Sequence, residues 1–179
     1  MTDDLISNLR IVLSNDPALD LRAMNLRAYL ETRDPALVRV VPGMKPRWFE
    51  IRALDPFEVA AVKSAVSAAG MVIPAIQCGL VSVTGPGFDD GTARPTRDKE
   101  SPDGRRVGVW DPKDIDALFK KLGWNRLLEV ALVIIERADA GNVDGGGVRF
   151  TLPPLSQPVL AQSDRLRAEQ TREESATRT

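Results

Sequence analysis

The sequence predicts an α+β fold that is mostly helical, with four to five helices and a small β-hairpin or sheet. Segments that begin with Asp-Pro carry apolar residues at helical spacing. Residues 47–52 instead alternate with a period of two, which is typical of a strand. The chain has 179 residues with 43% hydrophobic content, enough for one core. We therefore expect a single α+β domain over residues 1–150 and a flexible tail over residues 151–179.

The first part of the chain predicts two helices. Residues 3–14 place their apolar side chains at helical spacing, which favours a short amphipathic helix. Asp16-Pro17 then resembles an N-cap followed by a proline in the first turn. The apolar stripe that follows consists of Leu19, Ala23, Leu26 and Leu30. We expect a second helix that ends near residue 34.

The next segment predicts a β-hairpin. Two apolar runs, residues 37–41 and 47–52, flank Pro42-Gly43, a pair typical of turns. Successive strand side chains point to opposite faces, so Phe49 and Ile51 should face the core. The solvent-facing side chains should be Glu50 and Arg52, beside an amphipathic Trp48.

The middle of the chain begins with a capping box. In Asp55-Pro56-Phe57-Glu58, an N-cap aspartate precedes a proline and, three residues on, a glutamate. This predicts a helix that ends at Gly70. Residues 71–83 are the most apolar stretch; a short buried helix is favoured, and a strand stays open because periodicity does not separate the two in a brief run. Glycine, proline and charge dominate residues 84–106, which predicts a long mobile loop or extended arm.

The last part of the predicted domain is again helical. A short strand at residues 107–110 should close the loop, and Asp111-Pro112 repeats the capping pattern for a helix that breaks at Gly123. Residues 124–137 continue at helical spacing and should form the central core helix. The run of glycines at residues 145–147 is expected to be a hinge.

Composition argues against several functions. With 24 basic and 25 acidic side chains the net charge is −1, so no overall field would attract nucleic acid or an anionic membrane. The chain has no histidine, the side chain most used for general acid–base catalysis and metal ligation. An acidic N-terminus and the lack of a long apolar run argue against export and membrane insertion. We expect a cytoplasmic protein that is not an enzyme.

Three groups of residues could in principle carry chemistry. Cys78 lies among apolar neighbours, which favours a buried thiol over a nucleophile. A set of loop carboxylates could gather around calcium, but their spacing matches no EF-hand, and arginines lie between them. That set is Asp89, Asp90, Asp98, Glu100 and Asp103. Helix capping and the helix dipole account for Asp111, Asp114 and Asp116. We therefore expect no catalytic, cofactor-binding or metal-binding residues.

Three aromatic residues are candidates for a protein interface. Trp48 lies on the predicted strand, Phe57 in the capping box, and Trp124 at the start of the last helix. Aromatic side chains are enriched at the centres of protein interfaces. Packing within the core is the alternative for each of them.

The order of these features resembles the tail assembly chaperones of long-tailed bacteriophages. The similarity lies in residues 44–54 leading into Asp55-Pro56-Phe57-Glu58, in the apolar residues 75–83 with their following loop, and in residues 111–118 leading to the last helix. It covers about residues 37–138. The resemblance implies a non-enzymatic protein that coats the long helical tape-measure protein, keeps it soluble, and helps to recruit tail tube subunits. It implies those two proteins as partners and leaves homo-oligomerisation open.

The sequence is also compatible with functions other than a tail assembly chaperone. The chain would also fit a structural head–tail joining protein or another virion component whose loop and tail become ordered on assembly. A regulatory protein-binding module is a further alternative. An enzyme that uses carboxylates and a metal ion is the least favoured, because only the acidic loop motivates it.

Overall fold

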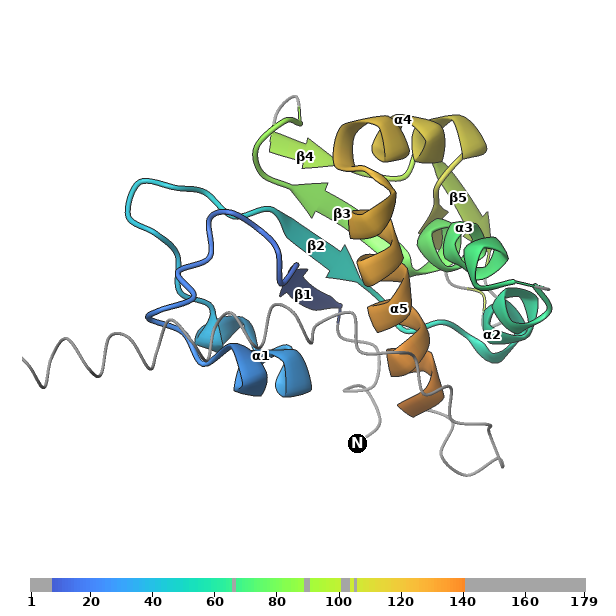
Figure 1. Ribbon diagram of the computed structural model, residues 1–179. Helices are drawn as coiled ribbons and strands as arrows, with labels where there is room; N and C mark the ends of the chain where they lie inside the picture. The colour runs from blue at the N-terminus through green and yellow to red at the C-terminus, as the bar shows by residue number, and fades with distance from the viewer. Residues whose placement is uncertain (1–7, 66, 89–90, 101–103, 105, 141–179) are drawn as a thin grey trace, which may run out of the picture.

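A computed structural model describes residues 8–65, 67–88, 91–100, 104 and 106–140. The predicted glycine hinge and the predicted tail at residues 151–179 lie outside these ranges. The described residues form five α-helices, one 3₁₀ helix and two antiparallel sheets, which confirms the α+β class (Figure 1). The helices are α1 (Leu26–Thr32), η2 (Pro35–Leu37), α2 (Pro56–Lys63), α3 (Ala68–Gly79), α4 (Pro112–Leu122) and α5 (Trp124–Ala140). The strands are β1 (Leu9–Val12), β2 (Trp48–Ile51), β3 (Leu80–Thr84), β4 (Thr92–Ala93), β5 (Arg97–Glu100) and β6 (Arg106–Val109).

The four-stranded sheet holds the core on one face. Its strand order is β1-β2-β3-β4, and Ile11, Phe49 and Val83 lie side by side across β1, β2 and β3. All three side chains are buried and belong to one cluster with apolar residues of α5. In Figure 1, α5 crosses in front of the sheet, with α2 and α3 to its right and α4 above. The central helix and the core-facing alternation of β2 are thus as predicted.

The predicted helix at residues 3–14 is wrong for the described residues, because Leu9–Val12 form strand β1. Ile11 contributes to the main core, whereas Val12 packs into a second cluster with α1. Both faces of this strand are covered, so its apolar residues are not restricted to alternate positions. A short continuous apolar run of this kind is compatible with helix or strand, and pairing with β2 decides for strand.

The helix predicted from Asp16 begins later than expected. Its helical part is α1, capped by the Asn25 side chain. Asp16 instead accepts hydrogen bonds from the backbone N–H groups of Ala18, at 2.9 Å, and Arg47, at 3.0 Å. The aspartate that resembles an N-cap therefore stabilises a turn and ties it to the segment before β2.

The predicted hairpin is correct for one strand only. Residue Val40 forms an isolated bridge with Leu19, while β2 pairs with β1 and β3. Phe49 and Ile51 are buried, as predicted. The expectation that Glu50 and Arg52 face solvent is wrong, since both are half-buried. Glu50 accepts hydrogen bonds from Asn8 and Ser82, and Arg52 pairs with Glu58.

The middle of the chain divides at places that the sequence did not predict. The capping box at Asp55 is confirmed, but α2 ends at Lys63, and Ser67 caps a new helix before Gly70. Residues 71–83 hold both of the structures considered, because α3 runs to Gly79 and β3 follows at once. The loop predicted at residues 84–106 contains β4 and β5, and β5 pairs with β6. Cross-strand pairing gives this polar segment an order that its composition does not indicate.

The predictions for residues 107–137 are confirmed in order. β6 lies at the expected short strand, Asp111 caps α4, and the chain turns at Gly123 into α5. Trp110 is buried between these elements, and its Nε1–H donates a hydrogen bond to the Leu80 carbonyl at 2.6 Å. Packing rather than ligand binding therefore accounts for Trp110.

The second cluster is organised by a buried tyrosine. The Tyr29 hydroxyl accepts a hydrogen bond from the Val12 N–H and donates one to the Val12 carbonyl, both at 2.7 Å. These two bonds satisfy the backbone N–H and carbonyl of Val12, the last residue of β1. Burial raises the pKa of this hydroxyl above its ordinary value of 10.0, and the hydrogen bond from Val12 partly offsets the rise.

Tyr29→Phe should lower the free energy of unfolding by about 1 to 2 kcal/mol, because both Val12 groups lose a buried partner. The contribution from the raised pKa is fully present below pH 10.0 and is lost as pH rises through the folded-state pKa. Urea unfolding of both proteins at neutral and alkaline pH measures this. The wild-type advantage should shrink above pH 10.0; an advantage that grows there would contradict the assignment.

Candidate protein-binding surface

The corner between α4 and α5 exposes an aromatic pair. Gly123 has φ +81°, a left-handed conformation that glycine adopts without strain, and it lets α5 begin directly after α4. Trp124 is 41% exposed and stacks on Phe119, with ring centroids 5.1 Å apart and an angle of 14° between the planes. Phe119 itself packs against the main core, so the exposed indole of Trp124 stacks on a ring that the core supports.

Next to this corner, two cations flank Phe88. The Arg47 guanidinium lies 5.9 Å and the Lys121 ammonium 5.2 Å from the centre of the Phe88 ring, distances at which cation–π attraction operates. The turn that carries Phe88 is anchored, because Arg47 Nη2 donates a hydrogen bond to the Pro86 carbonyl at 2.8 Å. At Gly85, φ is +127° and a Cβ would lie only 2.9 Å from the Pro46 carbonyl oxygen, so glycine permits this close approach.

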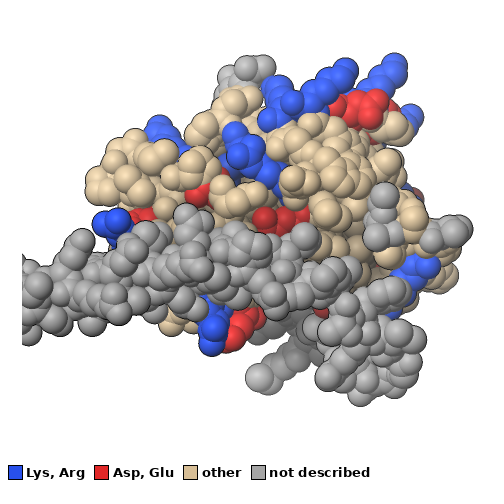
Figure 2. Space-filling model, viewed as in Figure 1, with Lys and Arg blue, Asp and Glu red and all other residues tan. Residues whose placement is uncertain are grey.

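Arg126 adds a third cation. Its Nη1 donates a hydrogen bond to the Leu122 carbonyl at 3.3 Å. Burial lowers the pKa of Arg47, repulsion from Arg126 lowers it further, and Asp16 opposes both. The positive charge of Arg126 therefore acts on Arg47. In Figure 2, basic side chains gather over the region of α4 and the start of α5, with a few acidic ones among them.

We call this region the basic aromatic surface, made of Arg47, Phe88, Phe119, Lys121, Trp124 and Arg126. A shallow depression of about 350 Å³ opens at its edge. The residues that line it are Asn15, Leu122, Gly123, Trp124, Asn125 and Arg126. It thus combines an indole face, a guanidinium group and two neutral amides.

The three aromatic residues predicted for an interface do not form one surface. Trp124 belongs to the basic aromatic surface. Trp48 is half-buried against the second cluster, with the Arg10 guanidinium 5.0 Å from its ring centre. Phe57 is 70% exposed on α2, which packs beside Ile135 and Ala138 of α5. At about 1.5 Å per residue, those positions lie roughly 17 to 21 Å along α5 from Trp124.

No local pattern in the sequence indicates the remaining members of the surface. Arg47 precedes β2, Phe88 follows β3, Lys121 lies in the last turn of α4 and Arg126 lies in the first turn of α5. The sequence predicts that Phe88 lies in a long mobile loop or extended arm. Only the pairing of β2 with β3 and the sharp corner at Gly123 bring these four segments together.

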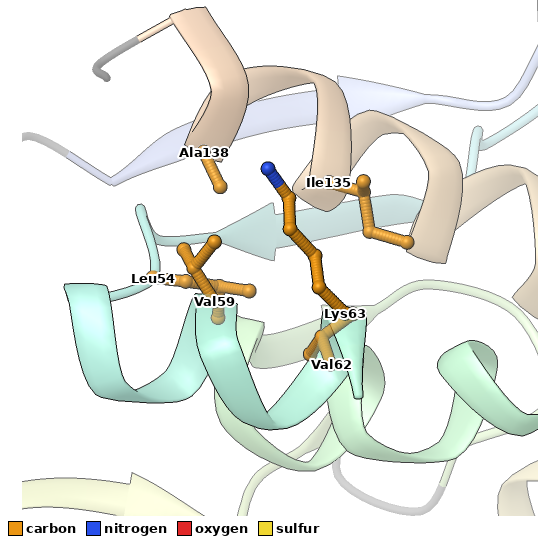
Figure 3. A pocket seen from close by; sticks show the side chains of 6 residues that line it. All are labelled: Leu54, Val59, Val62, Lys63, Ile135 and Ala138. Atoms are coloured by element: carbon orange, nitrogen blue, oxygen red, sulfur yellow. The ribbon is translucent and has the colours of Figure 1, made fainter. Parts of the chain in front are cut away.

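The cavity under α2 is too small for a ligand. Leu54, Val59, Val62, Ile135 and Ala138 enclose about 10 Å³, and the aliphatic stem of Lys63 runs along it (Figure 3). This volume is close to the minimum that a single water requires, and the lining is apolar. It is a packing gap between α2 and α5.

Cys78 lies in an environment that disfavours the thiolate. Its side chain is half-buried against the main core. Burial raises the pKa of the thiol, and the negative charge of Glu58 raises it further. A thiol that remains protonated is a poor nucleophile at neutral pH.

The described acidic residues do not form a metal site. In the described part of the chain, no three carboxylate or cysteine side chains lie close enough together to hold a metal ion. Asp98 and Glu100 are exposed on β5, while Asp89, Asp90 and Asp103 lie outside the described residues. Asp111 caps α4 and pairs with Arg97, and Asp114 accepts a hydrogen bond from Thr96.

The described helices include none that is both long and apolar enough to cross a membrane. The fold and its surface define an α+β domain with a basic aromatic surface at the α4–α5 corner. No family model, curated protein or solved structure matches the chain.

Proposed function

We propose that this protein is a non-enzymatic assembly chaperone of a long-tailed bacteriophage, which binds the long helical tape-measure protein and helps to recruit tail tube subunits in the host cytoplasm. The observation that carries the binding function is the exposed Trp124, which stacks on Phe119 and shares a surface depression with Arg126. Large aromatic residues next to arginine are the side chains that most often dominate binding energy at protein interfaces. The order of elements over residues 37–138 supports the particular class.

The physical demand on such a chaperone fits the exposed aromatic residues. A long amphipathic helix that has not yet been enclosed exposes apolar side chains and aggregates unless they are covered. Trp124 and Phe57 are both exposed. Trp124 begins α5, whereas α2, which carries Phe57, packs near the C-terminal end of α5. Two separate apolar contact points on a small protein would let several copies cover an extended helix.

Affinity purification from cells that produce the natural partners tests this function. Tagged wild-type protein should co-purify with a long helical protein and a tube subunit, identified by mass spectrometry. Trp124→Ala should reduce recovery by at least about tenfold, as expected for a central aromatic residue. Lys113→Ala, an exposed change at the other end of α4, serves as the matched control and should leave recovery unchanged.

Two outcomes would contradict the chaperone function. Co-purification of capsid or connector proteins, together with presence of the chain in purified particles, would favour a structural virion component. Recovery of a signalling or transcription factor instead would favour a regulatory module. Loss of binding in Trp124→Ala counts only if the circular dichroism spectrum shows that the variant is folded.

A further inference from the structure

We infer that the basic aromatic surface binds an acidic, aromatic- or leucine-containing segment of a partner protein, with carboxylates facing the three cations and an apolar side chain resting on Trp124. This inference rests on the proposed protein-binding function and deepens it. It names the chemistry that the partner must present at this surface. The overall net charge of −1 does not predict such a preference, because it hides the local charge.

The ion pairs of the three cations decide how much charge the surface offers to a partner. Among the described residues, no carboxylate pairs with Arg47, Lys121 or Arg126. Their contacts are to the Pro86 carbonyl, the Phe88 ring and the Leu122 carbonyl. Two acids lie near them: Asp16 attracts Arg47, and Glu129, one turn along α5 from Arg126, accepts a hydrogen bond from the Ser14 N–H at 3.0 Å. The three cations outnumber these two acids, so the described part of the surface retains positive charge for an incoming group.

The repulsion between Arg47 and Arg126 adds to this preference. Arg47 is half-buried, and its Nε is shielded from solvent without a hydrogen-bond partner. Burial and the charge of Arg126 both lower the pKa of Arg47. A carboxylate bound at this surface would offset that repulsion and could accept charge-assisted hydrogen bonds from an arginine. Arginine is suited to this role because its planar fork matches a carboxylate.

The depression supplies the apolar part of the site. Its volume of about 350 Å³ lies at the lower end of the range for small-ligand pockets, which suits one large side chain. Trp124 provides the apolar wall, while the amides of Asn15 and Asn125 can bond to the backbone of the bound segment. A protein segment presents backbone, carboxylate and apolar groups together.

Nucleic acid is the competing occupant, since aromatic and basic residues also bind single strands. The local charge distribution favours protein, because acidic side chains share α4 with its lysines. A nucleic-acid surface usually carries a continuous basic stripe that follows the phosphate backbone. The three clustered cations fit a short acidic segment better.

Fluorescence anisotropy tests the inference with a labelled peptide that alternates glutamate with leucine and phenylalanine. A matched peptide with glutamine in place of glutamate is the chemical control, and oligothymidylate is the nucleic-acid probe. The full chain should bind the acidic peptide at least about tenfold more tightly than the glutamine peptide. The preference should fall as salt concentration rises, because exposed charges are screened.

Charge-reversal variants locate the site. Arg126→Glu and Lys121→Glu should each weaken binding of the acidic peptide by about tenfold or more. Lys113→Glu makes the same change in charge outside the surface and should leave binding unchanged. Circular dichroism and thermal unfolding of each variant separate loss of the surface from loss of the fold.

Three results would overturn the inference: no binding of the acidic peptide, equal binding of both peptides, or tighter binding of oligothymidylate. Its failure is distinguishable from failure of the chaperone function. If Arg126→Glu still recovers the helical partner and tube subunit from cells, the proposed function stands and the assignment of this surface fails. If the acidic peptide binds but no tail protein is recovered, the surface assignment stands and the chaperone function fails.

Discussion

Glu58→Ala should lower the free energy of unfolding by about 3 to 5 kcal/mol, the typical loss when one partner of a buried ion pair is removed. Glu58 is only 3% exposed, and its carboxylate accepts hydrogen bonds from both terminal nitrogens of Arg52, at 2.9 and 2.7 Å. It also accepts one from the Asp55 N–H at 3.0 Å, which completes the capping box of α2. Alanine would leave the Arg52 charge, 13% exposed, without its partner.

Two further variants separate the contribution of the Arg52–Glu58 ion pair to stability from that of the α2 capping box. Glu58→Gln keeps an oxygen that can accept from the Asp55 N–H, so its loss should be smaller than that of the alanine variant. Arg52→Met removes the other charge while retaining an apolar stem. Added to Glu58→Ala, it should restore part of the lost stability, because no unpaired charge then remains.

Urea unfolding followed by circular dichroism gives these free energies and their coupling in a double-mutant cycle. If Glu58→Ala lowered stability by less than about 1 kcal/mol, the pair would behave as an exposed ion pair, contrary to its burial. The pair also lies beside a second connection, since the Arg52 N–H donates to the Gly79 carbonyl at 2.9 Å. Arg52 therefore links the end of β2 to α2 through its side chain and to α3 through its backbone.

Gly79→Ala should lower the free energy of unfolding by about 3 kcal/mol or more, at or beyond the upper end of the usual range for overpacking. Gly79 ends α3, where the helix packs against α5. A methyl group there would collide with the Ile134 side chain, which is fully buried. Neither side chain has space to move, so the two helices would have to separate.

Removing the opposing side chain should rescue this variant. Gly79→Ala combined with Ile134→Ala should be more stable than the sum of the two single effects predicts, because the new methyl group then occupies vacated space. Gly70→Ala, on the same helix, has its nearest neighbours at 3.3 Å and no left-handed backbone. It should change stability by no more than about 1 kcal/mol. Thermal and urea unfolding measure all four proteins, and additive effects of Gly79→Ala and Ile134→Ala would contradict the contact.

Local signals in the sequence were sufficient for several elements of the fold. Asp55 and Asp111 each precede a proline, and both cap helices, because the side chain satisfies backbone donors within three residues. Gly123 ends α4 for an equally local reason, its left-handed conformation. The alternation of β2 and the helical period of α5 likewise follow from which side chains need burial. Composition also determined that no histidine takes part in any function of this chain.

Contacts between distant residues decided the rest. Leu9–Val12 form a strand because β2 offers hydrogen-bond partners and because clusters on both sides bury Ile11 and Val12. Residues 71–83 divide into helix and strand for the same reason, since β3 pairs with β2 once α3 has packed on α5. The basic aromatic surface has no local signal, because its cations and rings come from four segments that meet only in the folded chain. The sequence determines interactions within a few residues, whereas strand partners and shared surfaces depend on which distant segments bury each other.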